Sequence, residues 1–135
     1  MDTRELVKAA LEAREDSYST YSGFAVGAAL LTKSGSIYQG ANIENAGHSG
    51  TVCAERTAIF KAVSEGERAF SAMAVAGGKA GALPEFFCSP CGVCRQVMAE
   101  FCDGDFIIYF AKSENEIQEH TLRELFPHPF GPKDL

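Results

Sequence analysis

Two cysteines, Cys91 and Cys94, lie three positions apart and directly follow Pro90. Proline is favoured in the first turn of a helix, because its missing N–H would have no partner there. The pattern predicts a helix that opens at Pro90 and carries both thiols on one face of its N-terminus. The partial positive charge of that terminus favours the thiolate form. Two thiolates on one face supply half of the tetrahedral ligand set that zinc takes in proteins.

A second segment, residues 51–56, can complete such a site. Cys53 lies at the start of another predicted helix and adds a third thiolate. Three protein ligands leave one position of zinc for a water molecule, which is the arrangement of catalytic zinc sites. Zinc can lower the pKa of that water to about 7. Glu55, two residues after Cys53, is placed to hydrogen-bond the water and to carry its proton.

Two arginines accompany the cysteines, Arg56 after Glu55 and Arg95 after Cys94. Three thiolates on a divalent ion carry one excess negative charge, which would weaken the pull of the metal on its water. We therefore expect both guanidinium groups to donate hydrogen bonds to the thiolates and to offset this charge.

The composition agrees with a single soluble domain over residues 1–135. The net charge of -6 argues against a general nucleic-acid binder, which usually has a basic face. No apolar run reaches the roughly 20 residues of a membrane helix, and the first residues do not resemble a signal peptide. The five cysteines are an odd number, which speaks against a disulfide framework. We expect a cytoplasmic protein that binds neither nucleic acid nor membrane.

Hydrophobic periodicity outlines the elements that must position these residues. It predicts helices over 3–16, 51–65 and 90–101, and a helical turn over 122–125. Strands are predicted over 25–31, 36–40, 70–76, 106–110 and 116–120, with a loop over 77–87. Strands that alternate with helices indicate an α/β domain around one sheet. The early hairpin at Lys33-Ser34-Gly35 makes that sheet mixed rather than purely parallel.

Together the two cysteine segments resemble the signature of the zinc-dependent cytidine deaminase family. Similarity to the family extends in order over essentially the whole chain. It includes residues 21–30 (YSGFAVGAAL), 42–45 (NIEN), 89–96 (SPCGVCRQ) and the tail around Leu125-Phe126-Pro127 and Phe130. A cysteine rather than a histidine at position 53, in so short a chain, is similar to the homotetrameric branch that acts on free nucleosides. His48 departs from the family, which usually has a tyrosine at this place.

The resemblance implies a three-layer α/β/α fold around a mixed five-stranded sheet, with one zinc ion per chain. It also implies hydrolytic deamination of cytidine and deoxycytidine to uridine and deoxyuridine, as in pyrimidine salvage. A zinc-bound hydroxide would attack C4 of the cytosine ring. Glu55 would move the proton of the water to N3 and then help the amino group to leave as ammonia.

Roles for five further residues follow from the same resemblance. Asn42 and Glu44 would hydrogen-bond the hydroxyls of the ribose. The backbone at Ala54 would contact the base, and Phe24 would pack on the face of the base. Phe130 matches an aromatic residue that neighbouring subunits lend to each other's sites. We therefore expect a homotetramer with its sites near the subunit interfaces.

Other interpretations of the cysteines are open from the residues alone. Cys91 and Cys94 could form a redox pair, although this would leave Cys53 and Glu55 unexplained. Cys88 could be a fourth zinc ligand, which would make the site structural and Glu55 an ordinary acidic residue of a first helical turn. The default for Cys88 is a buried and inert thiol.

Two other functions compete with cytidine deamination. One is the deamination of another aminopyrimidine nucleoside, such as an antibiotic of the blasticidin type. Asn42 and Glu44 favour a plain nucleoside over that substrate. The other is a non-catalytic zinc module that binds nucleic acid or a protein, and the acidic net charge speaks against the nucleic-acid version.

Overall fold

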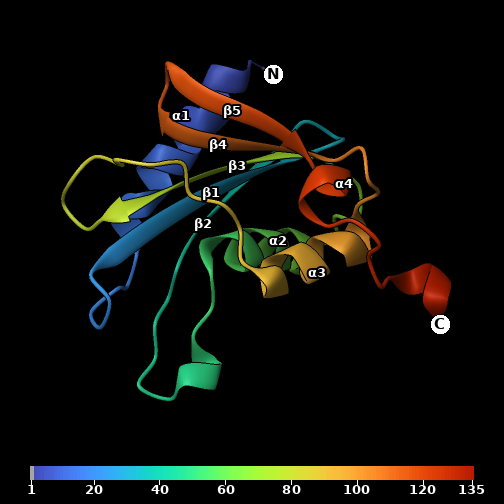
Figure 1. The fold of residues 1–135 in the computed structure, drawn as a ribbon, viewed down its shortest axis with the longest axis horizontal. Helices are drawn as coiled ribbons and strands as arrows, with labels where there is room; N and C mark the ends of the chain where they lie inside the picture. Colours follow the sequence, from blue (N-terminus) through green and yellow to red (C-terminus); the bar gives the residue numbers. More distant parts are fainter. Residues whose placement is uncertain (1) are drawn as a thin grey trace.

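The structure is a computed structural model that describes residues 2–135. Its centre is a five-stranded sheet in the order β2-β1-β3-β4-β5 (Figure 1). Neighbouring strands are antiparallel except β3 and β4, which are parallel. The strands are β1 (Phe24–Thr32), β2 (Ile37–Ala41), β3 (Phe70–Lys79), β4 (Ile107–Ser113) and β5 (Glu116–Thr121). The predicted mixed sheet of five strands is therefore confirmed.

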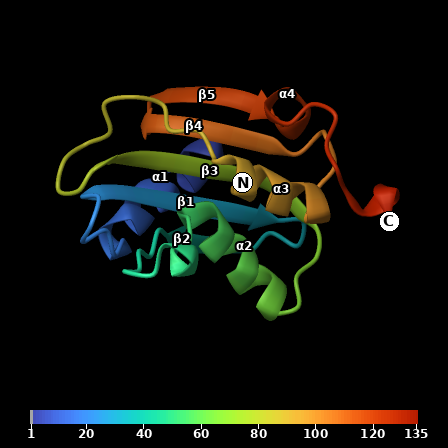
Figure 2. The same ribbon diagram turned by 60° about the horizontal axis from the view of Figure 1, so that its bottom comes forward.

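Helices cover both faces of the sheet, which completes the expected three-layer α/β/α arrangement (Figure 2). The helix α1 (Thr3–Ala13) lies on one face, and α2 (Ala54–Ser64) and α3 (Gly92–Phe101) lie side by side on the other. A one-turn helix, α4 (Leu122–Leu125), follows β5. Short 3₁₀ turns occur at Arg14–Asp16, His48–Gly50 and Pro132–Asp134. Among residues 2–135, no helix is both long and apolar enough to cross a membrane.

The apolar run of β1 is explained by burial on both faces of the sheet. Ala28 packs in the larger core under α2 and α3, while its neighbour Ala29 packs in the smaller core under α1. Both side chains are fully buried. A strand between two helical layers has no solvent face, so its sequence shows no alternation of polar and apolar residues. Small residues here let the helices approach the sheet closely.

The helix predicted over 51–65 begins only at Ala54, and the strand predicted over 106–110 continues to Ser113. Two further predicted boundaries, both close to the cysteines, were also wrong. The strand β3 continues to Lys79, so Gly77 and Gly78 belong to it and not to a loop. They pair with Val26 and Ala25 of β1. A side chain at Gly77 would reach within 2.8 Å of the sulfur of Cys88, so this glycine allows a close approach rather than a turn.

The second wrong boundary concerns the cysteine helix. The helix α3 begins at Gly92 instead of Pro90, and Cys91 is its N-cap, with extended backbone angles. Pro90 precedes the cap, where it is fully buried. Cys94 is then the third residue of the helix. An N-cap side chain and the third helical residue lie close together, so the two thiols still face one another.

Gly40 sets the position of α2, which begins directly after Cys53. A Cβ atom at Gly40 would lie 2.5 Å from the Ala58 nitrogen and 2.6 Å from the Ala54 carbonyl oxygen. We predict that Gly40→Ala lowers the free energy of unfolding by about 1–3 kcal/mol, because the helix must move away from the sheet. It should also reduce the zinc content, since the displaced helix start carries Cys53.

A matched control for this prediction is Gly27→Ala. Gly27 lies against the Ala10 carbonyl and the Arg14 nitrogen, on the opposite layer of the sheet. This variant should also unfold more readily but should keep its zinc. The measurements are denaturant unfolding and metal analysis of both purified variants. Equal zinc loss in the two variants would contradict a specific link between Gly40 and the metal centre.

Candidate metal centre and active site

The three predicted zinc ligands come together at the N-termini of α2 and α3. Cys53 is the N-cap of α2, and neither its thiol nor that of Cys91 makes a hydrogen bond that caps its own helix. The Sγ atoms of Cys53 and Cys91 are 3.6 Å apart, and those of Cys91 and Cys94 are 3.4 Å apart. All three sulfur atoms lie within 4.8 Å of one another.

This spacing fits a tetrahedral zinc ion. Zinc–sulfur bonds of about 2.3 Å place the sulfur atoms of a tetrahedral site about 3.8 Å apart. Across residues 2–135, the cluster of possible metal ligands contains these three residues and no fourth. Cys88 is outside this cluster, and burial raises the pKa of its thiol to about 11. The donor set is thus that of a site with one position left for water or substrate, and not that of a four-thiolate structural site.

The thiols hold their protons unequally. The hydrogen bond between Cys94 and Cys53 is the largest effect that lowers the pKa of Cys53 to about 5, with burial opposing it. The Arg56 Nη2 donates to the Cys53 sulfur at 3.3 Å and lowers that pKa further. The same Cys53–Cys94 hydrogen bond raises the pKa of Cys94. The thiol of Cys53 is therefore more acidic than that of Cys94, and Arg56 lies where it can offset thiolate charge.

Glu55 is buried beside the cysteines, with only 3% of its surface exposed. Burial is the main cause that raises the pKa of its carboxyl to about 7, and the charge of Cys53 adds to the effect. A carboxyl with a pKa near neutrality can both accept and donate a proton under physiological conditions. A bound dication would pull this pKa down, because it stabilises the carboxylate.

Asn42 follows β2 and is held against the start of β1. Its Oδ1 accepts hydrogen bonds from the Ser17 hydroxyl and the Val26 N–H. Its Nδ2 donates to the Phe24 carbonyl at 2.9 Å. These contacts use both acceptor positions of the amide oxygen and one of the two N–H donors. One N–H of Asn42 is therefore left for a ligand.

Glu44 is held by the loop that precedes β1. Its Oε1 accepts from the backbone N–H groups of Tyr21 (2.9 Å) and Ser22 (3.1 Å), and its Oε2 accepts from the Ser22 hydroxyl. These hydrogen bonds, the Ser22 hydroxyl first, lower the pKa of Glu44 below its usual value. The same segment is joined to the residue before Cys53, because the backbones of Ile43 and Val52 hydrogen-bond to each other.

The remaining candidates lie at different depths. Ala54 is completely buried as the first residue of α2. Phe24 is half-buried and stacks on Phe86, with ring centroids 5.8 Å apart. Phe130 is 57% exposed in this single chain, and its carbonyl accepts a hydrogen bond from the Gln96 side chain.

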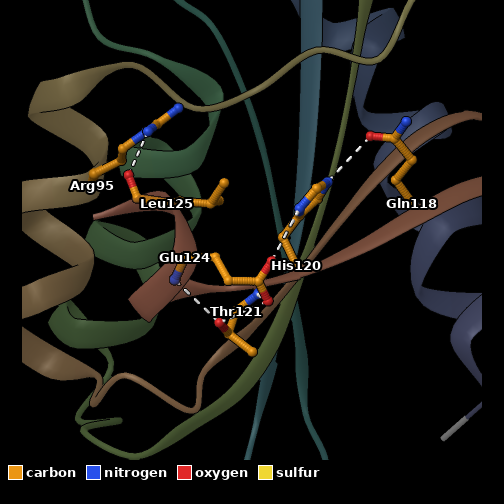
Figure 3. Close-up of polar contacts among 6 residues, drawn as sticks. All are labelled: Arg95, Gln118, His120, Thr121, Glu124 and Leu125. Carbon is orange, nitrogen blue, oxygen red and sulfur yellow. Dashed lines mark hydrogen bonds and ion pairs between the residues drawn. The ribbon is translucent and has the colours of Figure 1, made fainter. Parts of the chain in front are cut away.

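Arg95 lies elsewhere than the expected contact with a thiolate. Its Nε donates to the Pro90 carbonyl at 2.9 Å, and its Nη1 donates to the Leu125 carbonyl (Figure 3). Among residues 2–135 it makes no hydrogen bond to a sulfur atom. Of the two arginines, only Arg56 meets the cysteines.

The residues that orient the candidate site residues were not predicted from the sequence. Ser22 binds Glu44 through both its backbone and its hydroxyl, and the same hydroxyl accepts the Phe24 N–H. Ser17 holds Asn42. The only available signal was a group of hydroxyl residues in the turn before β1, which is common in turns of any function. Phe86 lay in a segment assigned to a loop.

Comparisons with known proteins agree with this geometry. A family model described as the cytidine and deoxycytidylate deaminase zinc-binding region matches residues 1–110. A cytidine deaminase of Sporosarcina psychrophila is 49% identical over the whole chain and 96% of its own length. One of Halalkalibacterium halodurans is 50% identical over the whole chain and 98% of its length.

Solved structures give the same answer. The crystal structure of a cytidine deaminase from Burkholderia pseudomallei superposes with a TM-score of 0.88 and 38% identity. The alignment covers 96% of this chain and all of that one. With the family model over most of the sequence and close relatives over all of it, the chain belongs to the cytidine deaminase family.

Proposed function

We propose that the protein hydrolyses cytidine and deoxycytidine to uridine and deoxyuridine with release of ammonia, as in pyrimidine salvage. One observation carries the proposal. A buried carboxyl, Glu55, lies two residues from the first of three thiols whose spacing fits zinc with one position open. A structural zinc site has no need of a buried acid beside its ligands, whereas hydrolysis requires a group that carries protons.

Zinc, when bound by Cys53, Cys91 and Cys94, supplies a Lewis acid that makes a water molecule acidic enough to ionise near neutral pH. Glu55 accepts a proton from the attacking water and donates it to N3 of the cytosine ring. It then passes the second proton to the amino group at C4, whose bond to carbon breaks. The sum is one water consumed and one ammonia released, so Glu55 returns to its starting state.

Asn42 and Glu44 are proposed to bind the sugar. After its contacts in the protein, Asn42 keeps one N–H donor, and the Oε2 of Glu44 keeps one lone pair beside the Ser22 hydroxyl. One donor and one acceptor complement a single hydroxyl, which can accept from Asn42 and donate to Glu44. Phe24 and the backbone at Ala54 are assigned to the base.

The proposal also includes a homotetramer in the cytoplasm, where free nucleosides are salvaged. Two features of the single chain support shared sites. Phe130 is exposed on a C-terminal segment that projects away from the sheet (Figure 1). Residues 45–50 are also exposed, on a loop that extends from the body between β2 and α2. An exposed apolar surface of this kind is typical of a site that another protein chain covers.

The role of Glu55 is tested by Glu55→Gln. We expect kcat for cytidine to fall by about 10²–10⁴-fold, because the amide cannot carry a proton. Zinc content and thermal stability should be preserved. The control is Glu65→Gln at the C-cap of the same helix, which should leave kcat unchanged. Substantial turnover by Glu55→Gln would remove Glu55 from the mechanism.

Single-hydroxyl recognition is tested with sugar analogues. Cytidine and deoxycytidine should react with similar kcat/KM. Removing the remaining ring hydroxyl, as in 2′,3′-dideoxycytidine, should lower kcat/KM by about 10–100-fold, because a hydrogen bond to a charged group is lost. In Glu44→Ala the difference between deoxycytidine and dideoxycytidine should largely vanish. If that difference persists in the variant, Glu44 does not read the sugar.

The shared site is tested by mixing two variants, each of which should be less active than the wild type. Glu55→Gln chains have an intact Phe130, and Phe130→Ala chains have an intact Glu55. After subunit exchange, hybrids should contain sites with both groups, so the mixture should be more active than the sum of its parts. If native mass spectrometry shows mixed tetramers and the mixture still recovers no activity, Phe130 serves no neighbouring site.

A further inference from the structure

Arg95 connects two segments that are far apart in the sequence. Its Nε donates to the carbonyl of Pro90, the residue directly before the Cys91 ligand. Its Nη1 donates to the carbonyl of Leu125, 30 positions further along the chain. The guanidinium is half-buried at this place. A planar fork with several donors can span two carbonyl groups in this way.

The Leu125 carbonyl lies at the end of α4, a one-turn helix whose start is held by several contacts. At the start, Thr121 and Glu124 form a reciprocal capping box (Figure 3). The other oxygen of Glu124 faces His120 of β5 at 3.9 Å. The backbone N–H groups of Leu122 and Arg123 donate to the carbonyls of residues 106 and 104. At the end of the helix, Arg95 holds the Leu125 carbonyl.

Gln96 adds a second contact from the same helix. Its side-chain amide donates to the Phe130 carbonyl at 2.8 Å. Two consecutive residues of α3, directly after the Cys94 ligand, thus bind the chain where α4 ends and again five residues later. Between these contacts the chain contains Pro127 and Pro129 and has no regular structure.

We infer that Arg95 is a positioning residue that couples the metal-bearing loop at Pro90 and Cys91 to the C-terminal segment, residues 126–135. A metal held by Cys91 fixes the Pro90 carbonyl, which orients the guanidinium toward Leu125. By linkage, an ordered C-terminal segment must in turn strengthen metal binding. The inference rests on the zinc site of the proposed function, but it does not depend on Phe130 entering a neighbouring site.

Hydrogen exchange of the C-terminal segment tests this coupling in the full chain. Exchange is followed by mass spectrometry in zinc-loaded protein and after removal of zinc by a chelator, at a concentration where light scattering gives one mass for both. In the wild type, the backbone N–H groups of residues 126–135 should exchange about tenfold faster without zinc than with it. This is the change expected for the loss of a charge-assisted hydrogen bond. The peptide of α1, on the other face of the sheet, should not change.

Variants assign the effect to Arg95. In Arg95→Met the segment should exchange fast whether or not zinc is bound. The matched control is Arg123→Met, which removes an exposed arginine of α4 that pairs with Asp105 and does not reach the metal loop. It should keep the zinc dependence of the wild type. An unresponsive wild-type segment, or a normal zinc dependence in Arg95→Met, would overturn the inference.

Zinc release to a coloured chelator provides a second test that does not depend on the exchange result. Arg95→Met should release zinc about 10–100-fold faster than wild type, in the range found for residues that orient metal ligands. Arg95→Lys keeps the charge but cannot bind both carbonyls, so it should also release zinc faster even if the methionine variant folds poorly. Release at the wild-type rate from Arg95→Lys would overturn the inference. A wild type that binds no zinc would instead overturn the proposed function.

Discussion

The meeting of two helix N-termini is the constraint on which the site depends. The N-caps of α2 and α3 are cysteines, and with Cys94 they bring three sulfur atoms within 4.8 Å of one another. Three thiols at this distance are costly if all are ionised, unless a cation lies between them. The close approach of β2 to α2 at Gly40 holds one of these termini in place. The packing of α2 on the sheet therefore also determines where one of the cysteines of the site lies.

The contacts around the metal centre form successive layers. Arg56 donates to the sulfur of Cys53, and Glu55 is buried next to it. Beyond them, the segment with Asn42 and Glu44 is hydrogen-bonded to the residue before Cys53 on one side and to the turn before β1 on the other. The polar groups that remain unused point to a small hydroxylated ligand. In the proposed function, the groups for proton transfer and for sugar binding are thus positioned by the same short stretch of backbone.

Much of this arrangement could be predicted from the sequence, for physical reasons. The ligand set follows from cysteine spacing at helix starts, and β1, β3 and β4 follow from apolar runs of strand length. The start of α3 was misplaced because Pro90 is used for burial and for its carbonyl, which no local pattern reveals. Gly77 was read as a loop residue because the contact that requires a glycine there, with the sulfur of Cys88, is made by the fold and not by neighbouring residues. Arg95 was expected at the thiolates, since its partner Leu125 lies 30 residues away and offers only a backbone carbonyl. The contacts that escaped prediction are mostly of this long-range kind.

The most direct test of the account is the ultraviolet absorbance of cytidine mixed with the zinc-loaded protein, run beside cytosine and CMP. We expect a rapid loss of the cytidine signal and little change with the other two, because the base alone lacks the hydroxyl proposed for Asn42 and Glu44 and CMP carries additional negative charge. Chelation of zinc should abolish the reaction. An unchanged cytidine signal from protein that holds one zinc ion per chain would contradict the assigned substrate, and would leave a zinc site without the proposed chemistry.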